Sequence, residues 1–215
     1  IEAYKKDVDI HALTASHLYN ISVEKITKEQ RFFGKTCNFG LVYGAGPKRF
    51  RQSALEGGVN IYIKEAKTLH KAFFQAYPGL KKYHADIEEF VLKHGYIETN
   101  FGFRRYLPQV YTGNRYEQAN AFRIAYNHPI QGSAAGILFE ALIRVRKALR
   151  GTEGRLLGTV HDSILILAPE DDYMEYAGIL KDAMEDYSYE WQPLHVPVSI
   201  KAGKSWGDLK EIKEL

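Results

Sequence analysis

The fold of this chain is decided by residues 31–44, which read Arg31-Phe32-Phe33-Gly34-Lys35-Thr36-Cys37-Asn38-Phe39-Gly40-Leu41-Val42-Tyr43-Gly44. Just before this stretch, Thr27 is followed three positions later by Gln30, the spacing of a capping box. That pattern predicts a helix near residues 28–43. The cluster Gly44-Ala45-Gly46-Pro47 then predicts its end, since glycine and proline interrupt helices.

On this expected helix, Arg31, Lys35, Phe39 and Tyr43 stand four positions apart. Each step of four turns an α-helix slightly more than once, so the four side chains form one slowly drifting stripe about 18 Å long. Two cations suit a triphosphate, and two rings suit stacking on a sugar or base. On spacing alone, an amphipathic helix with a mixed face is the favoured interpretation.

Upstream of residues 28–43, Asp7 or Asp9 is placed to cap a helix that runs through His11, Leu13 and Leu18. Further helices are expected at residues 64–77 and 79–95. The helical period is lost over residues 95–108, which predicts a short hairpin with an asparagine in its turn. The first half of the chain is therefore expected to be mainly helical.

The second half combines helices with antiparallel strands. An amphipathic helix is expected to begin near Ser133. The apolar runs 156–160 and 164–168 flank His161-Asp162-Ser163 and predict a β-hairpin with a polar tip. Another helix is expected after residues 169–172, and residues 196–200 are expected to return as a strand. The predicted class is α+β, with helices packed on one face of a small antiparallel sheet.

Composition sets broad limits on what the chain can be. With 45% hydrophobic residues among 215, a packed core is expected and global disorder is not. A net charge of +3 permits a nucleic-acid partner without requiring one. The single cysteine, Cys37, excludes a disulfide within the chain and fits a reducing compartment. No apolar run is long enough to cross a membrane, and residues 1–6 are unlike a signal peptide or a natural start.

Residues 31–44 resemble the fingers-helix motif of family A DNA polymerases, the DNA polymerase I type, and the resemblance runs from about residue 4 to residue 208. It implies a right-hand polymerase fold, with a helical fingers portion at residues 1–115 and a C-terminal palm portion at residues 116–215. By the same resemblance Arg31 and Lys35 hold the incoming triphosphate, Phe39 packs near its sugar and base, and Tyr43 occupies the template position.

One further segment resembles a motif of the family beside the nucleotide, and one position of the 31–44 motif departs from the family. Asp9-Ile10-His11 is similar to a segment whose histidine touches the nucleotide phosphates, although a lone histidine on a helix is more often a surface or capping residue. Gly34 stands where the family often has alanine. Glycine weakens a helix interior by about 1 kcal/mol relative to alanine.

Residues 129–135 resemble the Pro-Ile-Gln-Gly motif of the family. The match implies that Arg123, Asn127 and Gln131, again four apart, contact the primer–template at minor-groove acceptors that every base pair displays. The plainer interpretation is a polar helix start limited by Pro129. Gly136 replaces an aspartate that is usual in the family.

Val160-His161-Asp162-Ser163 resembles the palm motif His-Asp-Glu. The match implies that Asp162 is the shared ligand of two Mg²⁺ ions and that His161 contacts DNA. An aspartate in a hairpin is otherwise most often a turn former. Ser163 replaces the usual glutamate. The pair Arg104 and Arg105 matches a basic segment that contacts phosphate, or forms a solvated loop.

The resemblance implies template-directed DNA synthesis from deoxynucleoside triphosphates on primer–template DNA by two-metal phosphoryl transfer, inside the cell, in the cytoplasm or nucleoid, with phage and organelle origins both open. The palm motif that carries the other metal-binding aspartate is not in this sequence, so a second chain or a missing N-terminal region is expected to supply it. The alternatives are a non-catalytic primer–template-binding module and an inert fragment. A generic nucleotide-binding protein is disfavoured because no Gly-rich Walker loop is present.

Overall fold

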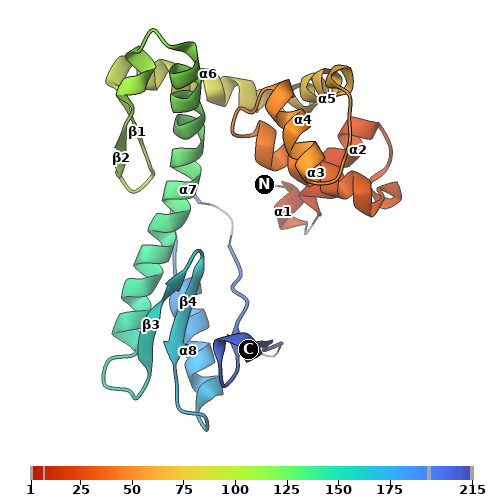
Figure 1. Cartoon of the computed structure of the whole chain (residues 1–215). Coiled ribbons are helices and arrows are strands. Elements are labelled where there is room, and N and C mark those ends of the chain that lie inside the picture. Colours follow the sequence, from red (N-terminus) through yellow and green to blue (C-terminus); the bar gives the residue numbers. More distant parts are fainter. Residues whose placement is uncertain (1, 7, 193–194, 214–215) are drawn as a thin grey trace. The chain divides into compact units, whose positions relative to one another are not determined.

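The computed structural model describes residues 2–6, 8–192 and 195–213, and the chain divides into two units, residues 1–132 and 133–215. Figure 1 shows the elements along the chain. In order they are α1 (Glu2–Lys5), α2 (Ile10–Tyr19), α3 (Lys28–Leu41), α4 (Pro47–Glu56), α5 (Ile63–Ala76), α6 (Pro78–His94), β1 (Tyr96–Glu98), β2 (Arg104–Tyr106), α7 (Arg115–Ala148), β3 (Arg155–Val160), β4 (Ser163–Leu167), α8 (Tyr173–Glu185), β5 (Lys201–Ala202) and β6 (Lys210–Glu211), with short 3₁₀ turns at Val23–Lys25, Pro108–Tyr111 and Trp206–Asp208.

The first unit starts with helices whose ends are capped as the sequence predicts. The Asp9 carboxylate accepts hydrogen bonds from the backbone N–H groups of His11 and Ala12 and so caps α2; Asp7 lies outside the described residues. Thr27 and Gln30 form the predicted capping box at the start of α3. Helix α4 was not expected from the sequence. It begins with Pro47 in its first turn, so the proline that ends the α3 segment also starts the next helix.

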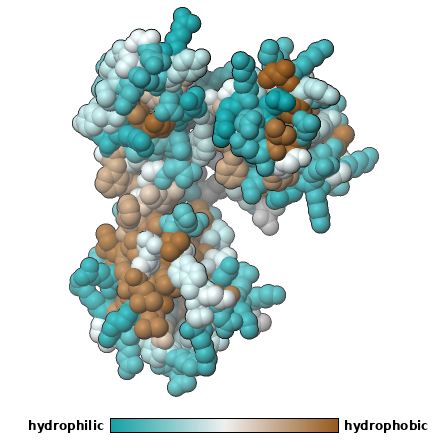
Figure 2. Space-filling model, in the orientation of Figure 1, coloured by the Kyte–Doolittle hydropathy of each residue, from teal (hydrophilic) through white to brown (hydrophobic). Residues whose placement is uncertain are grey.

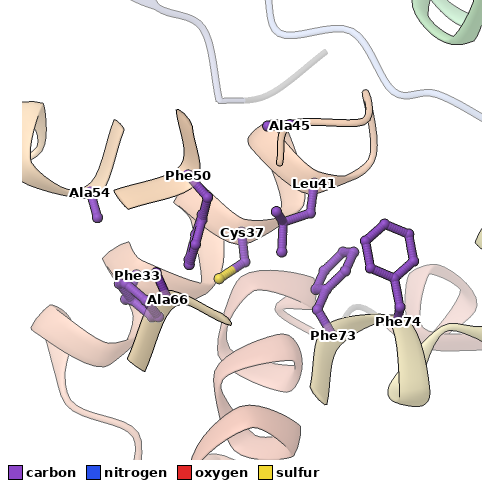
Figure 3. Close-up of a cluster of buried hydrophobic side chains, with 9 residues drawn as sticks. All are labelled: Phe33, Cys37, Leu41, Ala45, Phe50, Ala54, Ala66, Phe73 and Phe74. Atoms are coloured by element: carbon purple, nitrogen blue, oxygen red, sulfur yellow. The ribbon is translucent and has the colours of Figure 1, made fainter. Parts of the chain in front are cut away.

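Helices α3, α4 and α5 share one apolar core, shown in Figure 3. Phe33, Phe50 and Phe73 are almost completely buried in it, and the rings of Phe33 and Phe50 meet edge to face at 5.4 Å. Cys37 is fully buried among them. Burial raises the pKa of its thiol, because a thiolate is poorly solvated in an apolar core. This core fixes the inward face of α3, and the opposite face is left for other contacts.

The predicted hairpin at residues 95–108 is confirmed. Strands β1 and β2 pair antiparallel, with Ile97 opposite Arg105. A second core cluster lies beneath it and joins Val91, Ile97, Leu107, Val110, Ala121 and Ala125. Tyr96 and Tyr106 pack ring to ring at 5.7 Å, and the guanidinium of Arg104 lies 4.6 Å above Tyr96 while pairing with Glu98.

The helix expected near Ser133 begins earlier, at Arg115, and continues to Ala148. Asn114 caps it, since its side-chain oxygen accepts from the backbone N–H of Tyr116 at 2.9 Å. Pro129 lies inside α7 without ending it. A proline removes one helical hydrogen bond, yet the helix continues on both sides of Pro129. Arg123, Asn127 and Gln131 are therefore on a continuous helix and not at a helix start.

The second unit contains the end of α7, the β3–β4 hairpin and α8. The hairpin is antiparallel, with Val160 opposite Ser163 at its tip and a bulge between Leu156 and Gly158. Its inner face packs with α7 and α8 in a cluster that includes Val145, Ile164 and Leu180. The predicted strand at 196–200 is wrong, because the described residues there have no strand; the short β5–β6 pair follows instead. Pro197 lacks the N–H that a ladder needs.

The predicted α+β class is confirmed, since a helical first unit is joined to a second unit built on an antiparallel hairpin. Within the described residues, no helix is both long enough and apolar enough to span a membrane. Figure 2 shows a brown, apolar area on the second unit. The exposed large apolar side chains of this unit include Phe139, Ile143, Leu157 and Leu167. Contiguous apolar surface of this kind is typical of a face that another polypeptide covers.

Candidate nucleotide and nucleic-acid site

The stripe predicted on α3 lies on its solvent-exposed side. Phe39 is 58% exposed as a residue, and the Lys35 ammonium nitrogen lies 5.8 Å from the centre of the Phe39 ring. Tyr43 is two positions past the helix end and is half-buried. Because Phe33, Cys37 and Leu41 face the core from the opposite side of α3, the stripe is held outward by packing.

A groove of about 620 Å³ connects this stripe to α4 and to the first part of α7. Lys35, Phe39 and Tyr43 line it on one side, and Arg123 and Asn127 line it on the other. Its volume falls in the usual range for small-molecule sites. The lining contains three cations, from Lys35, Arg49 and Arg123, and no carboxylate. A groove of this charge favours an anionic ligand with an aromatic or apolar part.

Arg31 lies apart from the groove lining and is bound to Asp9. Its guanidinium donates to the Asp9 carboxylate in a close ion pair. This hydrogen bond holds the pKa of Asp9 below its ordinary value. Asp9 thereby joins the start of α2 to α3, and His11 follows two positions later.

His11 is placed beside the stripe by Asn38. The Asn38 amide nitrogen lies 3.0 Å from Nδ1 of His11 and also donates to the Ile10 carbonyl at 3.4 Å. Burial lowers the pKa of His11, and the charges of Arg31 and Lys35 lower it further. The neutral ring accepts the Asn38 amide at Nδ1, so Nε2 carries the proton and can donate it to an anion. The His11 and Phe39 rings are 5.9 Å apart.

Asn38 was part of the matched motif but received no role from the sequence. Its side-chain oxygen accepts from the Thr14 hydroxyl at 2.9 Å, and that hydroxyl is 2.7 Å from the Tyr77 hydroxyl. Asn38 thus links α3 to α2 through hydrogen bonds and orients the His11 ring. Arg49 was also missed, because it lies on α4, the helix that the sequence did not predict. Its neighbour Pro47 was the available signal.

Gly34, the departure from the family's usual alanine, has a packing reason. A Cβ added to Gly34 would collide with the His11 carbonyl oxygen and would lie 3.2 Å from Cβ of Ala15. Helix α2 therefore approaches α3 closely at this point, and only glycine leaves room for it. The helix-propensity cost expected from the sequence is offset by this close contact.

The residues predicted to contact DNA from α7 lie near Tyr43. Gln131 Nε2 donates to the Tyr43 phenol oxygen at 3.1 Å, and Arg123 is exposed and donates to the Asn120 side chain at 3.3 Å. The side-chain oxygen of Asn127 is buried at the groove and has no hydrogen-bond partner within the described part of the chain. A buried acceptor without a partner is expected to be satisfied by a ligand or water.

Asp162 lies in the second unit, exposed at the tip of the β3–β4 hairpin. His161 precedes it with a left-handed φ of 55°, which directs the turn. The Ser163 hydroxyl donates to the Val160 carbonyl at 2.8 Å, so the residue that replaces the family's glutamate closes the hairpin. Among the described residues, no cluster of three or more His, Cys, Asp or Glu side chains is placed to hold a metal ion. Asp162 is a suitable single ligand, but alone it does not make a Mg²⁺ site.

The chain resembles DNA polymerases over nearly its whole length. The model of the family described as DNA polymerase family A matches residues 1–208. DNA polymerase I of Deinococcus radiodurans is 35% identical over 209 residues, which are 97% of this chain and 21% of that protein. The thermostable DNA polymerase I of Thermus thermophilus is 33% identical over 213 residues, which are 98% of this chain and 24% of that protein.

A solved structure is similar as well. It is the POL domain of Pol1 from M. smegmatis in complex with DNA primer-template and dNTP, with a TM-score of 0.77 and 32% sequence identity. The match covers 91% of this chain and 33% of that one. This chain thus spans about a fifth to a quarter of the length of the curated relatives described above.

Proposed function

This chain belongs to DNA polymerase family A, and from that premise we propose that its α3 groove binds an incoming deoxynucleoside triphosphate for template-directed DNA synthesis. One observation carries the proposal: the groove brings Lys35, Phe39 and Tyr43 of the α3 segment together with Arg123 and Asn127 of α7. The first group suits a nucleotide and the second suits a primer–template. The M. smegmatis neighbour was solved with both kinds of ligand.

The roles follow from the chemistry of each side chain. Lys35 contributes a point charge to the triphosphate, and the neutral His11 donates from Nε2 to a phosphate oxygen. Phe39 supplies a ring face for the sugar and base. The ion pair with Asp9 holds the Arg31 side chain, and Arg31 adds a second cation at the N-terminal end of the stripe.

The same proposal assigns primer–template contacts to α7 and to the tip of the β3–β4 hairpin. Arg123 and Gln131 donate to minor-groove acceptors, and the unpartnered oxygen of Asn127 accepts from DNA or from a water that DNA orders. His161 contacts DNA at the hairpin tip. We assign residues 1–115 to the fingers and residues 116–215 to the palm.

Asp162 is proposed as one ligand of the divalent ions that this chemistry requires. Among the described residues, no three His, Cys, Asp or Glu side chains gather to hold a metal ion, so we propose that a second metal-binding aspartate comes from another polypeptide segment. A further region of the same protein or a partner chain would supply it. We place the activity inside the cell, where DNA and deoxynucleotides are found.

A non-catalytic primer–template-binding module is the second candidate, and Ser163 favours it. The serine removes a carboxylate that the family usually has next to Asp162 and uses its hydroxyl for the turn. This candidate keeps the α7 contacts and gives up synthesis. The intact stripe of Arg31, Lys35, Phe39 and Tyr43 argues against it, because a module that only binds DNA has no need of a nucleotide site.

Primer extension tests the proposal. The chain alone, and then the chain with any protein that co-purifies with it, is incubated with Mg²⁺, a primer–template and all four deoxynucleotides. Extension only with the co-purifying protein supports the proposed need for a second aspartate. Extension by the chain alone contradicts that need. Primer–template binding without extension or deoxynucleotide binding favours the non-catalytic module.

A further inference from the structure

The C-terminal end of α3 is held by a side chain of another helix. The last carbonyls of a helix lack intrahelical partners. Two of them are satisfied locally, since Gly44 N–H donates to the Leu41 carbonyl and Ala45 N–H donates to the Gly40 carbonyl, both at 3.1 Å. The next carbonyl, of Val42, lies 2.8 Å from Nε2 of His84 on α6.

This contact determines the proton position on His84. A carbonyl oxygen can only accept, so Nε2 of His84 must carry the proton that it donates. The imidazole also stacks on Tyr126 of α7, with ring centres 4.0 Å apart and planes at 21°. His84 is thus fixed both by a hydrogen bond along its edge and by a ring against its face.

Tyr126 is itself held firmly. It is 6% exposed, its hydroxyl donates to the Glu88 carboxylate, and its carbonyl accepts from the Tyr83 hydroxyl at 2.8 Å. Burial raises the pKa of Tyr83 to about 12, so its hydroxyl remains a proton donor at neutral pH. The stacked pair is therefore held by contacts from both α6 and α7.

The Tyr126 ring also packs against Gly44. A Cβ added at Gly44 would lie 2.7 Å from the ring, and Gly44 has a left-handed φ of 77°. Tyr43 stands between Val42, which His84 holds, and Gly44, which Tyr126 holds. Each neighbour of Tyr43 in the chain is thus restrained by one ring of the stacked pair.

We propose that His84 is a positioning residue for Tyr43, and through Tyr43 for the deoxynucleoside triphosphate and the template base in the α3 groove. The identity of the ligand rests on the proposed function. The restraint of Tyr43 by His84 depends only on contacts within this chain. His84 meets the apolar core that anchors α3 at Phe74, edge to face with ring centres 5.9 Å apart, and a phenylalanine at position 84 keeps a ring for that contact. Removing its donor therefore loosens the end of α3 and leaves the helix packed.

The test compares three variants of the full chain. His84→Phe keeps a ring for stacking but has no donor, and His84→Gln restores a donor of similar reach. His94→Phe is the control: it replaces histidine by phenylalanine at an exposed position at the end of the same helix. Binding of a fluorescent dATP analogue with Mg²⁺ gives the Kd, and hydrogen exchange gives the protection of the Gly44 and Ala45 amides.

We expect His84→Phe to raise the Kd for the dATP analogue about fivefold and to speed exchange at Gly44 and Ala45 by a similar factor, the change expected from one hydrogen bond of ordinary strength. His84→Gln should return both quantities to within about twofold of wild type, and His94→Phe should change neither. A purely structural role would not show this selective rescue.

Two outcomes separate the inference from the function on which it rests. If wild type binds the analogue and His84→Phe binds it equally well, or if His84→Gln behaves like His84→Phe, the positioning role is wrong. If wild type binds no analogue at all, the proposed nucleotide site fails. The exchange rates then still decide whether His84 restrains the residues around Tyr43.

Discussion

The guanidinium of Arg31 is paired with the carboxylate of Asp9, the residue that also caps the helix carrying His11. One aspartate therefore joins two functional candidates, the first cation of the α3 stripe and the histidine beside it. Both side chains are more than one-third exposed, at 48% for Arg31 and 38% for Asp9, so solvent screens the pair.

The first prediction concerns the pH dependence of this pair. Because Arg31 lowers the Asp9 pKa in the folded chain, Asp9 adds stability above its ordinary pKa of 3.8, and that stability is lost as the pH falls through the lowered value. Asp9→Asn keeps the capping oxygen and removes the charge. We expect it to lower the free energy of unfolding by about 0.5–1 kcal/mol at pH 7, and the difference should begin to shrink below pH 3.8 and vanish once the pH has fallen through the lowered pKa of Asp9.

Urea unfolding followed by circular dichroism at several pH values measures this difference. Asp86→Asn is the control, since it removes a more exposed carboxylate that pairs with Lys82 at 2.8 Å on α6. A difference between wild type and Asp9→Asn that stays constant from neutral to acidic pH would show that the Arg31 pair is not its source.

The second prediction separates nucleotide binding from DNA binding. Lys35→Ala removes a cation from the groove and should weaken deoxynucleotide binding about tenfold, the loss expected for one hydrogen bond to a charged group. Primer–template affinity should stay within about twofold. Lys48→Ala on α4 is the control, because Lys48 is exposed and does not line the groove. Equal losses of nucleotide and DNA affinity would remove Lys35 from its assigned role.

The third prediction concerns the close approach of α2 to α3. Gly34→Ala should destabilise the first unit by about 1–3 kcal/mol, because the added methyl group meets the His11 carbonyl and overpacks the contact. Gly178→Ala in α8 is the matched control, since a Cβ there meets nothing within 4 Å. It should stabilise the chain by about 0.5–1 kcal/mol through helix propensity.

Two spectroscopic signals distinguish unfolding of the first unit from unfolding of the second. Its two tryptophans, Trp191 and Trp206, both lie in the second unit, so tryptophan fluorescence follows that unit and circular dichroism follows the helices of both. Gly34→Ala should shift the dichroism transition and leave the fluorescence transition unchanged. A Gly34→Ala chain as stable as wild type would mean that α2 can move away without cost.

The fourth prediction concerns Asp162. In the assembled enzyme, Asp162→Ala should abolish primer extension while leaving the primer–template Kd within about twofold, since a metal ligand serves the reaction more than the binding of DNA. Asp171→Ala, at another exposed aspartate of the same unit, should leave extension intact. Extension that survives Asp162→Ala would remove Asp162 from the metal site.

The sequence predicted those parts of the fold that depend on local signals. Thr27 and Gln30 located the start of α3, and the two apolar runs on either side of His161-Asp162-Ser163 located the β3–β4 hairpin. The start of α7 was placed too late, because Pro129 suggested a boundary that long-range packing of the helix overrides. The strand expected at 196–200 failed because an apolar run does not show whether a neighbouring strand is available to pair with it.

The site was predictable to the extent that a motif carries it. Lys35, Phe39 and Tyr43 came from the motif, and the structure brings them to one groove with Arg123 and Asn127. The roles of these residues remain predictions. Asn38, Arg49 and His84 could not be assigned from sequence, because their contacts join residues more than twenty positions apart or lie on an unpredicted helix.

The burial of Cys37 makes this chain convenient for site-specific spectroscopy. The sole thiol is completely inside the α3 core and its pKa is raised, so labelling reagents that attack thiolates will leave it untouched in the folded protein. A cysteine introduced at Ser53, on the lining of the groove, would then react alone. One fluorophore or spin label could follow ligand arrival there in real time, without first removing a native cysteine.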